Sequence, residues 1–358
     1  MGTLNGEMIT LARDWRGITQ EELATASSVA QGTISKIENG RTDVPDDIVD
    51  RIAQALGFPR EFFFQDIRMV ELPQSFFRRR LTNVPQRTLK AARARWAVTL
   101  RGLRTLLEAV DFPECKAPRI DLGQSGMGPE EAARWLRREW NVPIGPVQNV
   151  TALIEKMGVL VVPFDFGSDR VAGMSISEPS LGLPPVIFVN RFTTGDRQRF
   201  TLLHELCHVC CHAHLVGDSS AERDLEDEAD LFASEFLLPS AQIIGHLAEF
   251  KLSSLPGLKV HWKASMAALL MKARTLGLLS DTRNTNLWRE FSRRGWKKEP
   301  DTVPVEPPEL LRRVVSLHEK QLGYTEAELC AILGHIGVAD LPCLYPVEKR
   351  GLRIVNGA

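Results

Sequence analysis

Two stretches of the sequence decide how the middle of this chain is built: HELCHVCCH at residues 204–212 and EDEADLFASEFLLP at residues 226–239. An α-helix repeats about every 3.6 residues, so His204 and His208, four residues apart, project as neighbours from one face. Two imidazoles at this spacing can hold one divalent metal ion. Glu205 lies between them in sequence and can accept a proton from a water molecule on that ion. The first stretch therefore predicts a helix that binds a metal ion.

The second stretch offers the third ligand that such a site needs. A catalytic zinc ion has three protein ligands and one position open to water. Glu226 and Asp230 lie four residues apart on a second predicted helix. Glu226 can therefore bind the metal while Asp230 hydrogen-bonds a ligand histidine and fixes its tautomer. Glu228 stays open as the alternative ligand, because sequence does not decide which of two helix faces meets the metal. Apolar residues would pack the second helix on the first: Ala229, Phe232, Ala233, Phe236, Leu237 and Leu238.

The residues before the first stretch predict a mixed domain of helices and strands. A change of composition at residues 124–129 suggests its beginning. Predicted helices follow at 132–140 and 150–157, strand-like runs at 159–163, 171–177 and 185–190, and the start of the metal-binding helix at 194–199. This order is typical of a zincin-like α+β domain, which we place at residues 124–258.

The paired motifs resemble those of the ImmA/IrrE family of metallo-endopeptidases, which have a gluzincin-like site, and FVNR (188–191) and RQRFTLLHE (197–205) also fit. The resemblance implies a Zn²⁺ ion held by His204, His208 and a glutamate, which we assign to Glu226 with Glu228 as the fallback. It implies that Glu205 is the catalytic general base. It also implies that the protein substrate is a helix-turn-helix repressor, and an extended substrate could pair with the strand at 187–190 by strand addition.

Three cysteines depart from the family pattern. Where the family often has glycine and aliphatic residues, this chain has Cys207, Cys210 and Cys211. Cys211 could replace the glutamate as a zinc ligand, but small buried packing groups are the preferred interpretation. His212 lies one turn beyond His208, and we interpret it as a helix-end histidine that bonds carbonyl groups, with substrate binding as the alternative.

The N-terminal residues 1–66 predict short helices separated by turns. The segments TQEELA (19–24), QGTISKIENGR (31–41) and IAQALGFP (52–59) resemble a Cro/CI-type (xenobiotic-response-element type) helix-turn-helix. The resemblance implies that this all-α domain binds a double-stranded DNA operator in the major groove. It places these residues at the DNA: Gln20, Gln31, Gly32, Thr33, Lys36, Asn39 and Arg41. A glutamine amide can pair with adenine, so Gln31 is the expected base reader, with Asn39 and Arg41 near phosphates.

The charge of this N-terminal region opposes easy DNA binding. Residues 1–65 contain six basic and ten acidic side chains, although phosphate neutralisation normally dominates affinity for DNA. The alternative is a helical bundle that serves protein contacts. Residues 68–104 reverse the balance, with ten basic side chains and one acidic. This basic connector, residues 67–123, is either a solvated helix or the source of the missing phosphate contacts.

The composition excludes other classes of protein. The chain has 358 residues, 44% hydrophobic and 25% charged, with a net charge of −1, which is ordinary for a soluble globular protein. We expect no membrane span and no signal peptide, because no apolar run is long enough. The six cysteines lack a regular disulfide spacing and indicate reduced thiols of a cytoplasmic protein.

The remaining residues carry no signal for chemistry. Residues 259–298 predict a helical extension, with Ser265 as an N-cap, and residues 299–308 predict a stiff linker. A C-terminal helical segment at 309–358 includes a capping box from Thr325 to Glu328. It could serve regulation or formation of a homodimer, and packing is the default interpretation.

These observations together predict a multidomain, DNA-binding transcriptional regulator with a zinc-dependent endopeptidase domain. Cleavage of a helix-turn-helix repressor or antitoxin-type protein would derepress stress, mobile-element or toxin–antitoxin genes. The rival interpretation is a non-proteolytic transcription factor or antitoxin whose zincin-like domain is a sensor for a ligand or partner. The intact Glu205 favours the enzyme, because a sensor needs metal ligands but no general base.

Overall fold

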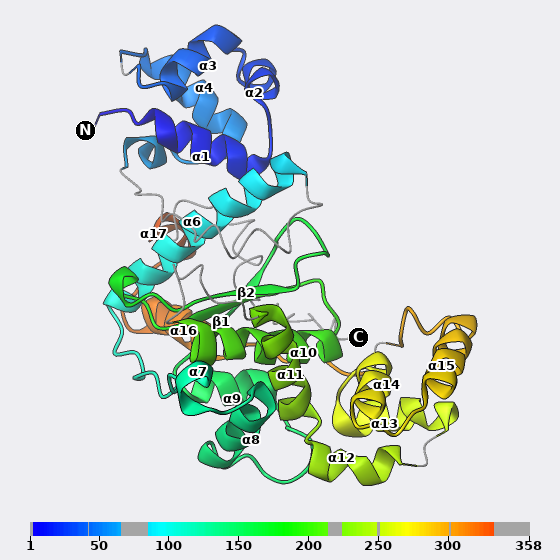
Figure 1. Ribbon diagram of the computed structural model, residues 1–358. Coiled ribbons are helices and arrows are strands. Elements are labelled where there is room, and N and C mark those ends of the chain that lie inside the picture. The colour runs from blue at the N-terminus through cyan, green and yellow to red at the C-terminus, as the bar shows by residue number, and fades with distance from the viewer. Residues whose placement is uncertain are drawn as a thin grey trace, which may run out of the picture. The chain divides into compact units, whose positions relative to one another are not determined.

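The computed structural model describes residues 3–41, 43–65, 85–213, 224–248, 251–300 and 302–332. The chain divides into two compact units (Figure 1). The first contains the described residues up to 65, residues 85–111 and residues 309–332, and the second contains residues 112–308. Arg68 and Arg78–Arg80 of the predicted basic connector, Cys343 and residues 333–358 of the C-terminal segment lie outside the described residues.

The first unit is entirely helical where it is described. Its elements are α1 (Gly6–Arg16), α2 (Gln20–Ser27), α3 (Gln31–Glu38), α4 (Asp46–Leu56), the 3₁₀ helix η1 (Arg60–Phe64), α6 (Gln86–Glu108), α16 (Leu310–Lys320) and α17 (Glu326–Ile332). The 23-residue helix α6 packs on α1 and also contacts α16 and α17. This arrangement confirms the all-α fold expected for the N-terminal domain.

Local capping explains where the first helices begin and end. The Thr19 side chain accepts a hydrogen bond from the Glu22 amide at 3.1 Å, and the Glu22 side chain accepts one from the Thr19 amide, which forms a capping box at the start of α2. Gly17 ends α1 in the left-handed conformation, with φ of 64°. The turn Ser28–Ala30 then leads into α3, the second helix of the predicted helix-turn-helix. Ile34 and Ile37 of that helix are fully buried, so its other side faces outward.

The second unit contains a small mixed sheet surrounded by helices. The strands are β1 (Leu160–Phe164), β2 (Gly173–Ile176) and β3 (Val186–Asn190), in the order β1-β3-β2. Strand β3 pairs parallel with β1 and antiparallel with β2. The helices are α7 (Leu122–Ser125), α8 (Pro129–Glu139), α9 (Val150–Lys156), α10 (Gly195–Cys207), α11 (Leu225–Leu237), α12 (Ser240–Leu247), α13 (Leu255–Trp262), α14 (Met266–Thr275) and α15 (Asp281–Arg293), with short 3₁₀ turns η2 (Pro179–Leu181) and η5 (Leu252–Ser254).

Strand β3 lies in the centre of this sheet, which corrects one sequence prediction. Both edges of β3 are occupied, so the strand at 187–190 cannot accept an added substrate strand. Among the described residues, β2 is the antiparallel edge strand.

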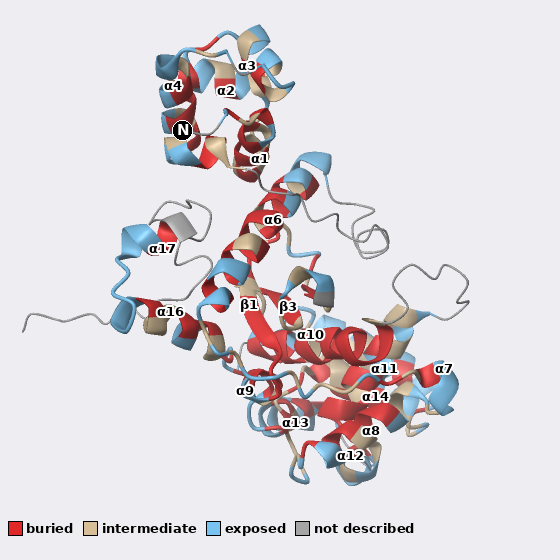
Figure 2. Ribbon diagram, turned by 90° about the vertical axis from the view of Figure 1, so that its left-hand side faces the viewer, coloured by how far each residue is buried: buried red, intermediate tan, exposed pale blue. Residues whose placement is uncertain are grey.

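Helix α10 runs through the interior of the second unit. It contacts β2, β3 and α9 and also packs on α11, which in turn packs on α8. Eleven of its thirteen residues are buried, and α10 is largely red in Figure 2. The chain continues directly into one turn of π-helix, η3 (His208–His212). Such turns occur mostly as single-turn insertions in α-helices, frequently at functional sites.

Residues 299–308 are not a free linker. Val303 is buried, and the Glu306 carboxylate accepts hydrogen bonds from the amides of Val150 and Thr151 at 2.7 and 3.1 Å. Arg199, fully buried in α10, also donates to Glu306. The proline content of this segment predicted a stiff linker. It could not predict that the segment packs against residues more than 100 positions earlier in the chain. We call residues 299–308 the strap, because they hold the ends of α9 and α10 together.

The predicted helical extension at 259–298 consists of the end of α13, followed by α14 and α15. Lys263 ends α13 in the left-handed conformation, with φ of 52°. The Ser265 side chain then accepts a hydrogen bond from the Ala268 amide at 3.0 Å, so it is the N-cap of α14. The predicted cap at Ser265 is confirmed. In the part of the chain that is described, no helix is both long and apolar enough to cross a membrane.

Candidate metal centre

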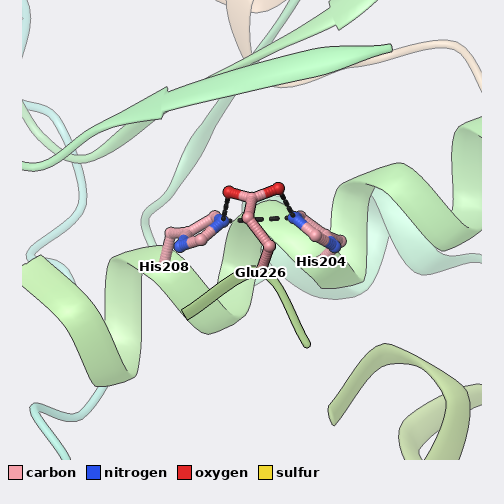
Figure 3. Close-up of side chains that lie close together, drawn as sticks. All are labelled: His204, His208 and Glu226. Carbon is pink, nitrogen blue, oxygen red and sulfur yellow. Dashed lines mark hydrogen bonds and ion pairs between the residues drawn. The ribbon is translucent and has the colours of Figure 1, made fainter. Parts of the chain in front are cut away.

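Three side chains from α10, η3 and α11 converge on one point (Figure 3). The Nε2 atoms of His204 and His208 are 3.1 Å apart. The Glu226 carboxylate lies between them, with one oxygen 3.6 Å from His204 Nε2 and the other 3.4 Å from His208 Nε2. Among the described residues, these three form the group of potential metal ligands whose donor atoms lie within 4.8 Å of one another.

The dimensions of this group fit zinc. Ligand atoms bound tetrahedrally at about 2.0–2.1 Å from zinc lie about 3.3–3.4 Å apart. The separations between the two Nε2 atoms and from each of them to one oxygen of Glu226, Oε2 for His204 and Oε1 for His208, bracket that value. Two imidazole nitrogens and a carboxylate oxygen are also a donor set that zinc prefers in catalytic sites. The Glu226 side chain is 37% exposed, whereas the imidazoles are nearly buried, so the site opens to solvent on the glutamate side.

Each imidazole is hydrogen-bonded on the side away from this point. His204 Nδ1 lies 2.7 Å from an Asp230 carboxylate oxygen. His208 Nδ1 lies 2.8 Å from His212 Nδ1, and His212 Nε2 lies 3.0 Å from a Glu228 oxygen. The structure thus brings Glu226 to the imidazole pair and directs Glu228 to His212.

Glu205 is the best-buried carboxylate of the site, with 1% of its surface exposed. Ser175 of β2 donates a hydrogen bond to its Oε2 atom at 2.9 Å. Gly173, also in β2, allows this close approach. A Cβ atom on Gly173 would lie 2.5 Å from the Thr201 methyl group and 3.2 Å from Glu205 Cγ. The edge strand therefore rests directly on the face of α10 that carries Glu205.

The three cysteines lie in the hydrophobic core of the second unit. Cys207, Cys210 and Cys211 are at most 1% exposed and pack among its apolar residues. Burial raises the pKa of the Cys207 and Cys210 thiols well above the ordinary value, which keeps them protonated. They are packing groups in this structure, in line with the preferred sequence interpretation.

Four of the predicted DNA contacts lie on α3, whereas Gln20 begins α2 and Asn39 and Arg41 follow the end of α3. Gln31, Gly32, Lys36, Asn39 and Arg41 are exposed, and Gln20 and Thr33 are half-buried. Gln31 Nε2 donates to Gln20 Oε1 at 2.8 Å, and Gln20 Nε2 donates to Glu38 at 2.6 Å.

Arg13 of α1 holds the same Glu38 carboxylate at 2.7 Å. A chain of hydrogen bonds therefore orients both glutamines. Arg41 pairs with Asp43 at 2.8 Å, and Asn39 Nδ2 donates to the Ser35 carbonyl, so both form contacts of their own in the absence of DNA.

Sequence reasoning missed two features of the metal centre. Ser175 gave no signal, because nothing in a lone serine on a strand shows that it faces a helix residue 30 positions later. His212 was interpreted as a helix-end histidine, but it lies between His208 and Glu228. The sequence shows the four-residue spacing of His208 and His212, but it does not show that a π turn connects these two residues.

Two family models match parts of the chain. The model of the IrrE N-terminal-like domain matches residues 154–274, and a helix-turn-helix family model matches residues 9–63. No curated protein matches the chain.

The fold and these matches define a regulator of the DNA-binding helix-turn-helix class that also carries a metallopeptidase-like domain. More particularly, the chain is a fusion of a Cro/CI-type helix-turn-helix with an ImmA/IrrE-type domain, as the sequence motifs indicated.

Proposed function

We propose that this protein is a DNA-bound regulator whose ImmA/IrrE-type domain is a zinc-dependent endopeptidase. Its substrate would be a helix-turn-helix repressor or an antitoxin-type protein, and cleavage would derepress stress or mobile-element genes in the cytoplasm. The observation that carries this proposal is the convergence of His204, His208 and Glu226 beside a buried Glu205.

The residues of the chain have separate tasks in this reaction. His204, His208 and Glu226 would hold zinc, which supplies a Lewis acid for the peptide carbonyl and makes water easier to deprotonate. Glu205 accepts the proton from the attacking water and returns it to the leaving amine. The hydrogen bond from Ser175 helps to hold the Glu205 carboxylate in a fixed orientation.

The substrate peptide would bind in extended form along β2. The edge of this strand offers backbone hydrogen-bonding groups, which is how peptides commonly join a sheet. Because Ser175 lies in β2 and contacts Glu205, a peptide paired with β2 would pass close to the general base. The corrected position of the edge therefore strengthens the case for strand addition, although at a different strand from the one predicted.

The decisive variant is Glu205→Gln in the full-length protein. It keeps the size of the side chain but removes the base, so we expect zinc content equal to that of the parent. Cleavage of the helix-turn-helix repressor encoded beside its gene should fall by roughly 10²- to 10⁴-fold. Mass spectrometry of the repressor and metal analysis of the protein measure the two effects.

The same variant separates the enzyme from the sensor. If Glu205→Gln regulates the target promoter as well as the parent does, the domain senses a ligand or partner and its proteolysis is not required. If the parent binds zinc but leaves the repressor intact, the endopeptidase proposal is wrong.

A further inference from the structure

We propose that His212 and Glu228 form a positioning pair that holds His208 in the orientation and tautomer needed to bind the metal ion. This inference rests on the proposed metal centre but not on peptide cleavage. It gives a role to two residues that neither the ligand set nor the general base uses.

The contacts form a continuous chain into the interior. His208 Nδ1 lies 2.8 Å from His212 Nδ1, and His212 Nε2 lies 3.0 Å from Glu228 Oε2. The His212 side chain is 3% exposed and that of Glu228 is 18% exposed. Hydrogen bonds that are shielded from water in this way hold their partners more firmly than exposed ones.

Proton positions along this chain are fixed by the chemistry of its ends. Glu228, when ionised, only accepts hydrogen bonds, so His212 Nε2 must carry a proton and be the donor to the Glu228 carboxylate. In a neutral ring, His212 Nδ1 is then an acceptor, and His208 Nδ1 must be the donor. His208 Nε2 is left with its lone pair, and this is the atom that faces Glu226 and His204. The pair therefore selects the one neutral tautomer of His208 that can bind metal through Nε2.

The tautomer of His204 is selected in the same way, but by direct contact with a carboxylate. His204 Nδ1 contacts the Asp230 carboxylate directly at 2.7 Å, which leaves His204 Nε2 for the metal. The Asp230 side chain is 60% exposed. His208 differs because its Nδ1 points along the π turn, where His212 is the neighbouring group. Glu228 on α11 then completes the connection from the second helix, as carboxylates commonly do behind metal-bound histidines.

The test is the affinity of full-length, metal-free protein for Zn²⁺, measured by competition with a chromophoric chelator. The variants are His212→Leu, which removes both hydrogen bonds, His212→Asn, which keeps an acceptor near the position of Nδ1, and Glu228→Gln. The matched control is Asp227→Asn, because it removes one negative charge from an exposed, neighbouring position on α11. Circular dichroism of each metal-free variant checks its fold.

We expect His212→Leu and Glu228→Gln to weaken zinc binding by roughly 10- to 100-fold, the effect usual for groups that orient a metal ligand. His212→Asn should recover part of the loss, and Asp227→Asn should bind zinc as the parent does. The absorption spectrum of the Co²⁺-loaded protein should shift in His212→Leu and Glu228→Gln, because the geometry around the metal changes.

Parent-like zinc affinity in folded His212→Leu or Glu228→Gln would overturn the proposal, and so would a loss in Asp227→Asn as large as in Glu228→Gln. Failure of the parent itself to bind zinc would overturn it together with the metal centre. Absence of repressor cleavage, by contrast, would remove the endopeptidase and leave the positioning pair intact. Glu228→Gln keeps the test valid if His212→Leu does not fold.

Discussion

A hydrogen bond from Ser175 helps to orient the Glu205 carboxylate. The two residues lie on different elements, and Gly173 is the small residue that lets these elements approach. The bond joins buried partners, so no water can take the place of the serine without rearrangement. The Glu205 carboxylate should therefore be held less firmly in its orientation when the serine is removed.

We predict that Ser175→Ala lowers kcat for repressor cleavage by about tenfold, which corresponds to about 1.4 kcal/mol and to the loss of one hydrogen bond. Zinc affinity should not change, because Ser175 contacts none of the three proposed ligands in the described hydrogen bonds. Single-turnover kinetics and zinc titration measure the two quantities. Ser177→Ala, two residues along the chain, is the control, and an equal loss in that variant would contradict the prediction.

The residues of the site differ in how readily the sequence predicts them. His204 and His208 follow from helical spacing alone, because one helix holds both. Glu226 and Glu228 could not be separated, since the choice depends on how α11 is rotated against α10. The structure turns Glu226 toward the imidazoles and Glu228 toward His212. The position of His212 in turn depends on a π turn, which a 3.6-residue repeat does not describe.

Buried ion pairs hold the helices of the second unit together. Glu235 of α11 accepts hydrogen bonds from Lys272 of α14 at 2.6 Å and from Arg134 of α8 at 3.1 Å, and its own side chain is fully buried. Burial by itself raises the pKa of Glu235, but the bonds from Lys272 and Ser240 outweigh it and hold the pKa below its ordinary value of 4.5. Glu235 thus stabilises the fold above that pH, and its contribution is lost as the pH falls through the lowered pKa.

We predict that Glu235→Gln destabilises the protein at pH 7 by roughly 3–5 kcal/mol, because it leaves Lys272 buried without its charged partner. The difference from the parent should be smaller at pH 3 than at pH 7, because Glu235 of the parent takes up a proton as the pH falls toward its lowered pKa. Urea unfolding of the metal-free proteins at both pH values gives the two differences. The exposed Glu139→Gln is the control, and a difference that stays constant between pH 7 and pH 3 would sink this prediction.

Element types in the second unit were predictable, but their arrangement was not. The three strand-like runs and the flanking helices appear where apolar patterns indicated them, which confirms the α+β class. The order β1-β3-β2 and the role of the strap depend on contacts between distant residues, such as Glu306 with the start of α9. Patterns within a short window contain no information about such contacts.

At the scale of the whole molecule, two units divide the chain, and the first is assembled from separated segments. Helix α6 and helix α16 belong to the same unit as the helix-turn-helix, although α16 begins more than 200 residues after α6 ends. Motifs revealed the two functional domains from sequence. The assignment of the segments between and after them required the contacts of the folded chain.

From the contacts of the strap we predict which truncated fragment of the second unit folds stably. A fragment of residues 112–308 should fold and unfold cooperatively, whereas a fragment of residues 112–298 should be less stable by several kcal/mol. The shorter fragment lacks Glu306 and leaves Arg199 and the start of α9 without that carboxylate. Urea unfolding followed by tryptophan fluorescence compares them. Equal midpoints would show that the strap adds nothing.

The first unit predicts a specific effect on DNA recognition. Once the operator has been selected from a random DNA pool, Gln31→Ala should cost about 1–3 kcal/mol of binding and relax the preference at one base pair. Lys36→Ala should instead weaken binding to all sequences and reduce its salt dependence. Gln54→Ala, exposed on α4, is the control in mobility-shift titrations. Unchanged base preference in Gln31→Ala would remove it as the base reader.

The π turn at η3 has a consequence for the history of this helix. A segment of this kind carries one residue more than a regular helical pitch needs, so excising a residue from 209–211 should relax it into ordinary α geometry and improve its backbone hydrogen bonds. The shortened helix would be more stable, but His212 would be turned away from His208. Selection for a working metal pocket would then have kept a locally irregular backbone that selection for rigidity alone would erase.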